Sequence, residues 1–163
     1  MRADAKEGSF LNLYAIPIAN GVLPRPDGGI LNGAFLEPIF AKMLITTGVG
    51  NEIFIFPVSS EDETFYPVGV VVRIEDMWTG KLSEQGAEIL FAKVIGRERY
   101  KAQSFDFSDD GLVASGLKRF YSSQMREMGY PVICGAGWYP TGGYTTFGTD
   151  RNNIEIMIYG FEF

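Results

Sequence analysis

Residues 68–78 read VGVVVRIEDMW, and this run constrains the fold more than any other part of the sequence. β-Branched residues are dense at its start and alternate with charged residues towards its end, which is typical of a long strand leaving a buried core. Further apolar runs of strand length cover residues 10–19, 30–36, 52–59, 87–95, 112–117 and 154–163. Six or more strands in one chain predict a β-barrel or a rolled sheet.

Two short helices are expected beside the strands. Pro38 suits the first position of a helix and Gly48 suits its end, so one helix is predicted between them. A second helix is expected over residues 120–128, where Gly129 stops it. The fold class is therefore mostly β with short helices, an α+β chain.

Glycine and proline predict where the strands are interrupted. Residues 20–29 contain two prolines and three glycines and are expected to form a loop, and residues 106–111 are expected to form a turn. Gly96 predicts a bend in a hairpin between residues 68–78 and 87–101.

Composition narrows the class of protein. The 163 residues are enough for one domain, with 46% hydrophobic and 21% charged residues, which excludes intrinsic disorder. A net charge of −6 has the wrong sign for a protein that holds phosphate backbones, so we expect no nucleic-acid partner. The chain has no histidine, which removes triads and zinc sites that depend on imidazole. We expect neither a metal nor a cofactor.

Cysteine usage and the first residues bear on the compartment. Cys134 is the only cysteine, so no disulfide forms within the chain and a reducing compartment is expected. The N-terminal residues contain no apolar run, and no segment approaches the ~18 apolar residues of a spanning helix. These patterns predict a soluble, cytoplasmic protein without a membrane partner.

Three cations alternate near the end of the predicted hairpin. Arg97, Arg99 and Lys101 would share one face of a strand and could clamp an anion. The alternative is an exposed strand face whose charge is balanced by Glu98 and neighbouring acids.

Four stretches, taken in order, resemble the N-terminal substrate-recognition domain of Lon proteases over residues 10–117. They are IPI with VLP and a glycine pair at residues 16–29, LEPIFAKM at 36–43, YPVGVVVRI at 66–74, and GRERY at 96–100 followed by LVA at 112–114. Ile39 and Phe40 depart from the Arg-Tyr that the family has after its helix-starting proline. The family's helical bundle is absent, and residues 132–163 stand in its place.

The resemblance implies a PUA-like pseudo-barrel of about six to eight strands. We expect one domain over residues 1–163, made of the Lon-like part at 10–117 and an extension at 118–163 that holds the second helix and a region rich in glycine and aromatic residues. The resemblance also implies a non-catalytic module that grips unfolded or degron-bearing polypeptide. The chain contains neither an ATPase nor a protease segment, and whether a protease or ATPase partner exists stays open.

A polypeptide-binding barrel needs exposed apolar surface or a free strand edge. The candidates for this surface, together with Arg97 and Arg99, are Phe35, Phe40, Met43, Trp78, Trp138 and Tyr139. The alternative for each aromatic residue and for Met43 is burial in the core; positions 40, 43 and 44 share one helix face. Two other functions stay open: a small His-free enzyme with a carboxylate or lysine site, and a structural β protein that self-assembles as a homo-oligomer.

Overall fold

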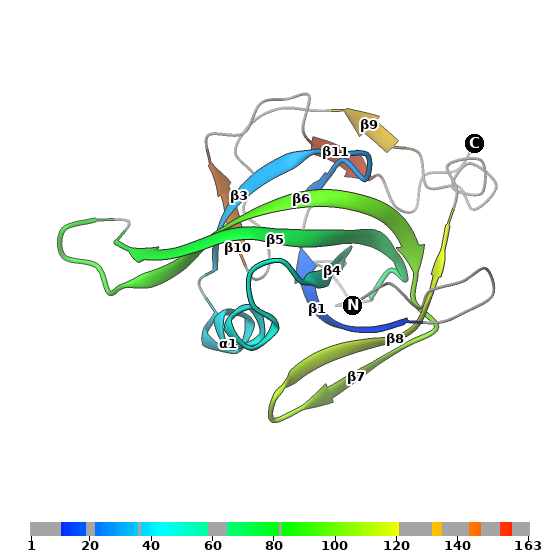
Figure 1. Ribbon diagram of the computed structural model, residues 1–163, viewed down its shortest axis with the longest axis horizontal. Helices are drawn as coiled ribbons and strands as arrows, with labels where there is room; N and C mark the ends of the chain where they lie inside the picture. The colour runs from blue at the N-terminus through cyan, green and yellow to red at the C-terminus, as the bar shows by residue number, and fades with distance from the viewer. Residues whose placement is uncertain are drawn as a thin grey trace.

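The computed structural model describes residues 11–18, 22–35, 37–58, 65–81, 83–120, 132–134, 144–147 and 154–157. These residues form β1 (Leu11–Ile18), β2 (Val22–Pro24), β3 (Ile30–Phe35), α1 (Pro38–Thr47), β4 (Glu52–Pro57), β5 (Val68–Gly80), β6 (Ile89–Lys101), β7 (Ser104–Ser108), β8 (Gly111–Arg119), β9 (Val132–Cys134), β10 (Tyr144–Phe147) and β11 (Ile154–Met157). The mostly β class predicted from the sequence is confirmed (Figure 1).

Eight strands form one sheet in the order β10-β3-β6-β5-β4-β1-β8-β7. Neighbouring strands are antiparallel except β1 and β4, which run parallel. The end of β6 also pairs with the end of β8, and this pairing closes β6, β5, β4, β1 and β8 into a ring. The expected pseudo-barrel is therefore present, with β3, β10 and β7 attached outside the ring.

The core lies between this ring and α1. β4 is buried on both faces from Ile53 to its end, so it reads as a continuous apolar run and not as an alternation. Helix α1 inserts Phe40, Met43 and Leu44 into the same core. The predicted helix boundaries are confirmed, with proline in the first turn and Gly48 at the C-cap.

The hairpin of β5 and β6 bends where the sequence predicts. The register between the two strands shifts opposite Gly96, and the loop at residues 25–29 lies against this point. The Gly28 N–H donates to the Gly96 carbonyl at 2.9 Å, and the Gly96 N–H donates to the Gly29 carbonyl at 2.8 Å. A Cβ atom at position 96 would overlap the Arg25 carbonyl oxygen, so the loop can approach β6 this closely only because residue 96 is glycine.

Two expectations about loops are wrong in part. Residues 20–29 contain the short strand β2, because its backbone pairs with β11 from the far end of the chain. Residues 106–111 do not form one turn, because β7 continues to Ser108 and pairs with β8. Partners distant in sequence, which local composition does not reveal, supply the backbone hydrogen bonds in both cases.

The second helix was expected over residues 120–128, and residues 121–128 lie outside the described residues. Phe120 is not helical; its N–H donates to the Arg99 carbonyl at 2.9 Å and its ring is buried. The expected extension therefore begins with the end of β8 at residues 118–119.

Two of the three strands described in the extension, β10 and β11, pair with strands from the first third of the chain, and β9 pairs with β11. β10 adds to the edge of β3, and β11 lies between β2 and β9 in a separate three-stranded sheet. The backbone of the extension is thus joined to the barrel by sheet pairing at two places.

Candidate functional site

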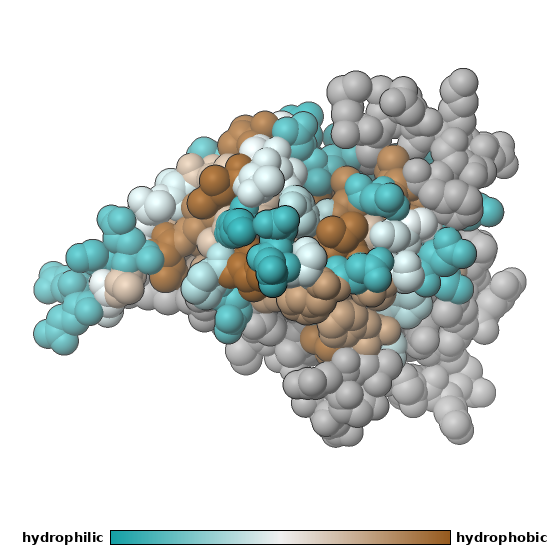
Figure 2. Space-filling model, turned by 90° about the horizontal axis from the view of Figure 1, so that it is seen from below, coloured by the Kyte–Doolittle hydropathy of each residue, from teal (hydrophilic) through white to brown (hydrophobic). Residues whose placement is uncertain are grey.

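The β5–β6 hairpin extends beyond the barrel as an arm, which we define as residues 75–81 and 83–93 (Figure 1). On one face of the arm, Trp78 lies opposite Phe91 and Asp76 lies opposite Lys93. Directly opposite residues on antiparallel strands point to the same side, so these four side chains share that face. The arm ends in hydrophilic residues (Figure 2).

Trp78 and Phe91 stack on each other. Their ring centroids are 5.8 Å apart and the ring planes differ by 8°. Phe91 is only 8% exposed, whereas Trp78 is 39% exposed and leaves much of its indole to solvent. Gly80 makes room for the stack, since a Cβ atom there would lie 3.1 Å from Cε2 of Phe91. The result is a supported aromatic surface on a projecting hairpin.

This surface is separate from the hydrophobic core. Phe91 and its cross-strand neighbour Ala34 on β3 are buried, yet neither belongs to the core cluster. Leu90 and Ala92, which precede and follow Phe91 in the strand, are members of that cluster. Because successive side chains of a strand point to opposite faces, the sheet here has one core face and one second apolar face. We call Trp78 and Phe91 the aromatic face, which Ala34 of β3 adjoins.

Three of the expected contact residues lie in the core. Phe35, Phe40 and Met43 are buried, with Met43 fully enclosed, which was the alternative that the sequence left open. The sulfur of Met43 accepts the N–H of Leu112 at 3.2 Å, so this side chain joins α1 to β8. Buried side chains offer no contact surface; Phe40 and Met43 lie on the face of α1 that is turned to the barrel, and Phe35 ends β3 with its ring in the same core.

The three alternating cations do not form a clamp. Arg97 is exposed and lies where the β5–β6 register shifts, whereas Arg99 is buried and Lys101 is exposed at the end of β6. The bulge breaks the regular alternation that would bring Arg97 and Arg99 to one face. Trp138 and Tyr139 lie outside the described residues. Of the expected contact residues, Trp78 is the aromatic one that the described structure exposes.

Sequence reasoning missed other exposed apolar residues. Phe107 on β7, Ile45 on α1 and Val49 after α1 are each more than half exposed. Figure 2 views the molecule from the side on which α1 and the β7–β8 hairpin lie, and it shows further hydrophobic side chains at the surface. The interpretation of residues 106–111 as a turn overlooked the alternation of Phe105 and Phe107 with the polar residues around them. That alternation is the sequence signal for a strand.

Comparison of the structure with solved structures identifies the fold. The N-terminal domain of Lon protease from the Mycobacterium avium complex superposes with a TM-score of 0.51 at 11% identity, covering 69% of this chain and 56% of that one. A Lon N-terminal domain protein from Xanthomonas campestris gives a TM-score of 0.52 at 20% identity, covering 68% and 60%. The chain has the fold of Lon N-terminal domains. The resemblance read from the sequence is thereby confirmed for the fold.

These two structural comparisons establish the fold of the chain. No family model and no curated protein matches the sequence. The chain spans somewhat more than half the length of each of the two solved chains.

The described residues also bear on metal sites and membrane-spanning helices. Within the described ranges, no three or more acidic or cysteine side chains gather closely enough to hold a metal ion. Among the same residues, no helix has the length and apolarity needed to cross a membrane.

Proposed function

We propose that this chain is a non-catalytic module that binds unfolded or degron-bearing polypeptide, and that the aromatic face of the arm is its contact surface. The observation that carries the proposal is the half-exposed Trp78, held flat on Phe91 on a Lon-like fold. Aromatic side chains supply a large contact area at low conformational cost, and stacking on Phe91 already restricts the indole before any ligand arrives.

The surroundings of the aromatic face support binding of an extended chain. Trp78 is followed along its face by the oppositely charged pair Asp76 and Lys93, so an apolar contact lies beside both signs of charge. Such a surface provides affinity through the aromatic ring without requiring one particular sequence. A separate protease or ATPase would then act on the bound polypeptide. The single cysteine of the chain fits a cytoplasmic location, where disulfides are rare.

The test is a binding titration with a reduced and alkylated, permanently unfolded polypeptide carrying a fluorescent label. Trp78→Ala is expected to weaken binding by roughly 30-fold, the size of a hot-spot contact, because it removes the exposed ring. Trp78→Phe keeps a ring on Phe91 and should stay within about threefold of the wild type. Anisotropy of the label measures both without using the protein's own tryptophans.

Ile45→Ala is the matched control, because Ile45 is an exposed apolar residue on α1 and not on the arm. It should bind like the wild type. Equal affinities for Trp78→Ala and Ile45→Ala would remove the arm from the binding site. Absence of saturable binding by the wild type, with the folded form of the same polypeptide as reference, would refute the function itself.

A further inference from the structure

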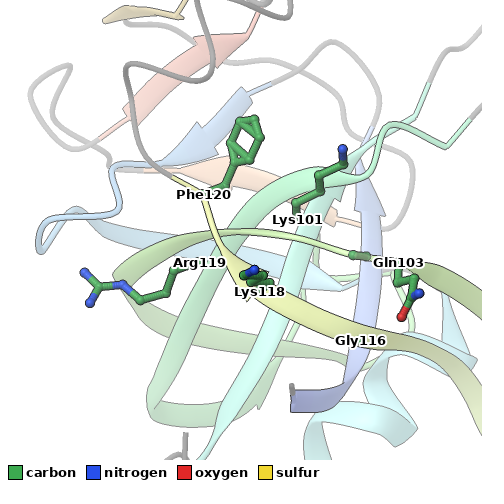
Figure 3. A pocket seen from close by; sticks show the side chains of 7 residues that line it. Lys101, Gln103, Gly116, Lys118, Arg119 and Phe120 are labelled. Atoms are coloured by element: carbon green, nitrogen blue, oxygen red, sulfur yellow. The ribbon is translucent and has the colours of Figure 1, made fainter. Parts of the chain in front are cut away.

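A second feature lies where the barrel closes. The ends of β6 and β8 enclose an open hollow of about 310 Å³ (Figure 3). Its lining residues are Lys101, Ala102, Gln103, Gly116, Lys118, Arg119 and Phe120. Three of the seven are cationic and none is acidic, in a chain whose net charge is −6. The hollow is therefore positively charged, although the chain as a whole carries a net negative charge.

The two lysines of the hollow lie on the two strands that close the ring. Lys101 and Lys118 are directly opposite in the β6–β8 register. Like charges at directly opposite positions destabilise a sheet. Among the described residues, no carboxylate forms an ion pair with either ammonium group. Within the described part of the chain, the closure of the ring thus holds two positive charges that have no ion-pair partner.

Arg119 plays a different part from the lysines. Its guanidinium points away from Lys118 and Gln103 (Figure 3), and its Nε lies 3.4 Å from Oε2 of Glu98. Glu98 also accepts a hydrogen bond from the Tyr100 hydroxyl at 3.1 Å. The charge of Arg119 is therefore matched by Glu98, and the two lysines are the cations of the hollow for which the described residues supply no ion-pair partner.

The remaining walls suit an anionic ligand with an apolar part. Lys101 Nζ lies 5.9 Å from the centroid of the Phe120 ring, which orients the ammonium beside an aromatic wall. Gln103 lies close over Gly116, where a Cβ atom would come within 2.6 Å of its amide oxygen. The Gln103 amide thus adds a polar group to the hollow, and the Phe120 ring and Ala102 supply its apolar walls.

We propose that this hollow binds a dianionic oxyanion, namely a phosphate group, either free or as a monoester. Two ammonium groups match two negative charges, and a lysine binds phosphate as a point charge. A phosphate between Lys101 and Lys118 would also remove the repulsion that the register imposes. The site is separate from the arm and does not depend on polypeptide binding.

The test is isothermal titration calorimetry with inorganic phosphate, sulfate and acetate at constant ionic strength. The full-length wild type should bind phosphate and sulfate in preference to acetate, because only the dianions neutralise both ammonium groups. Lys101→Gln and Lys118→Gln should each lose about tenfold or more in affinity for phosphate, the size of one lost charge-assisted contact. Lys81→Gln removes an equal charge at the tip of the arm and should bind like the wild type.

Phenyl phosphate distinguishes the two sources of the phosphate group. Tighter binding of phenyl phosphate than of inorganic phosphate, lost in Phe120→Leu, assigns the hollow to a phosphate monoester. Equal binding of the two probes assigns it to free phosphate. Equal phosphate affinities in Lys118→Gln, Lys101→Gln and Lys81→Gln would overturn the proposal.

Thermal unfolding gives an independent readout that does not rely on calorimetry. Without phosphate and at low ionic strength, Lys118→Gln should be at least as stable as the wild type, because the cross-strand repulsion is gone. Added phosphate should raise the Tm of the wild type clearly more than that of Lys118→Gln, because the variant binds phosphate more weakly. A phosphate-dependent rise in Tm that is equal in both proteins would also overturn the proposal.

Discussion

Replacing Gly69 by alanine is expected to remove about 3 kcal/mol or more of the free energy of unfolding, at the upper end for overpacking a core. Gly69 is buried in β5, where an added Cβ would overlap the Ile55 carbonyl oxygen of β4. The same atom would lie 2.8 Å from Cζ of Phe54 and 2.9 Å from Cα of Phe56. Two of these three obstacles are backbone atoms, and β4 cannot retreat because it pairs with β1 and β5 on its two sides.

Urea denaturation followed by circular dichroism measures this loss, and the Tm should fall by roughly 6–12 °C. Gly86→Ala is the control, because the nearest atom to its added Cβ is the Ser83 hydroxyl at 3.2 Å, in a turn on the arm. That variant should stay within about 0.5 kcal/mol of the wild type. A cost below about 1 kcal/mol for Gly69→Ala would mean that β4 and β5 are not packed this closely.

Replacing Phe56 by alanine is expected to cost about 3–5 kcal/mol. Phe56 is fully buried, and its ring centroid lies 4.4 Å from that of Phe105, 5.1 Å from Phe65 and 5.8 Å from Phe54. The cluster joins β4 to β7, which otherwise pairs with β8 alone. Loss of the ring would leave a cavity and also detach the edge strand from the barrel.

The matched control is Phe107→Ala, two residues beyond Phe105 on the same edge strand. Phe107 is 64% exposed, so its removal should change the free energy of unfolding by about 0.5 kcal/mol or less. Urea denaturation gives both values, and hydrogen exchange of the β7 amides reports whether the strand detaches in Phe56→Ala. Similar costs for the two variants would show that the four rings do not act as a cluster.

The aromatic face and the phosphate hollow differ in the strand pairing that holds their residues together. The aromatic face depends on a hairpin whose two strands are consecutive in the sequence and joined by residues 81–88, so Trp78 and Phe91 are brought together locally. The hollow depends on the β6–β8 contact, which comprises only two residue pairs. Stability changes that open the ring should therefore impair the hollow before they affect the arm.

The features that could be predicted from the sequence are those that depend on residues close together in the chain. The dense β-branched run at residues 68–78 predicts β5, Pro38 and Gly48 bound α1, and Gly96 marks the bend of the hairpin. Each of these follows from side-chain sterics or from glycine and proline stereochemistry, which act within a few residues. The four stretches at residues 10–117 likewise predict the Lon N-terminal fold, which the superpositions confirm.

Tertiary structure alone decided which face of each element is covered and which distant strands meet. Alternation places Trp78 and Met77 on opposite faces, but only packing shows that Met77 contacts the core while Trp78 lies on Phe91. Nothing in the local sequence brings Lys101 opposite Lys118, because that register arises when the ring closes. The hydrogen bonds that make residues 104–108 a strand also come from β8. Such pairings depend on the free energy of the whole sheet, which no local pattern contains.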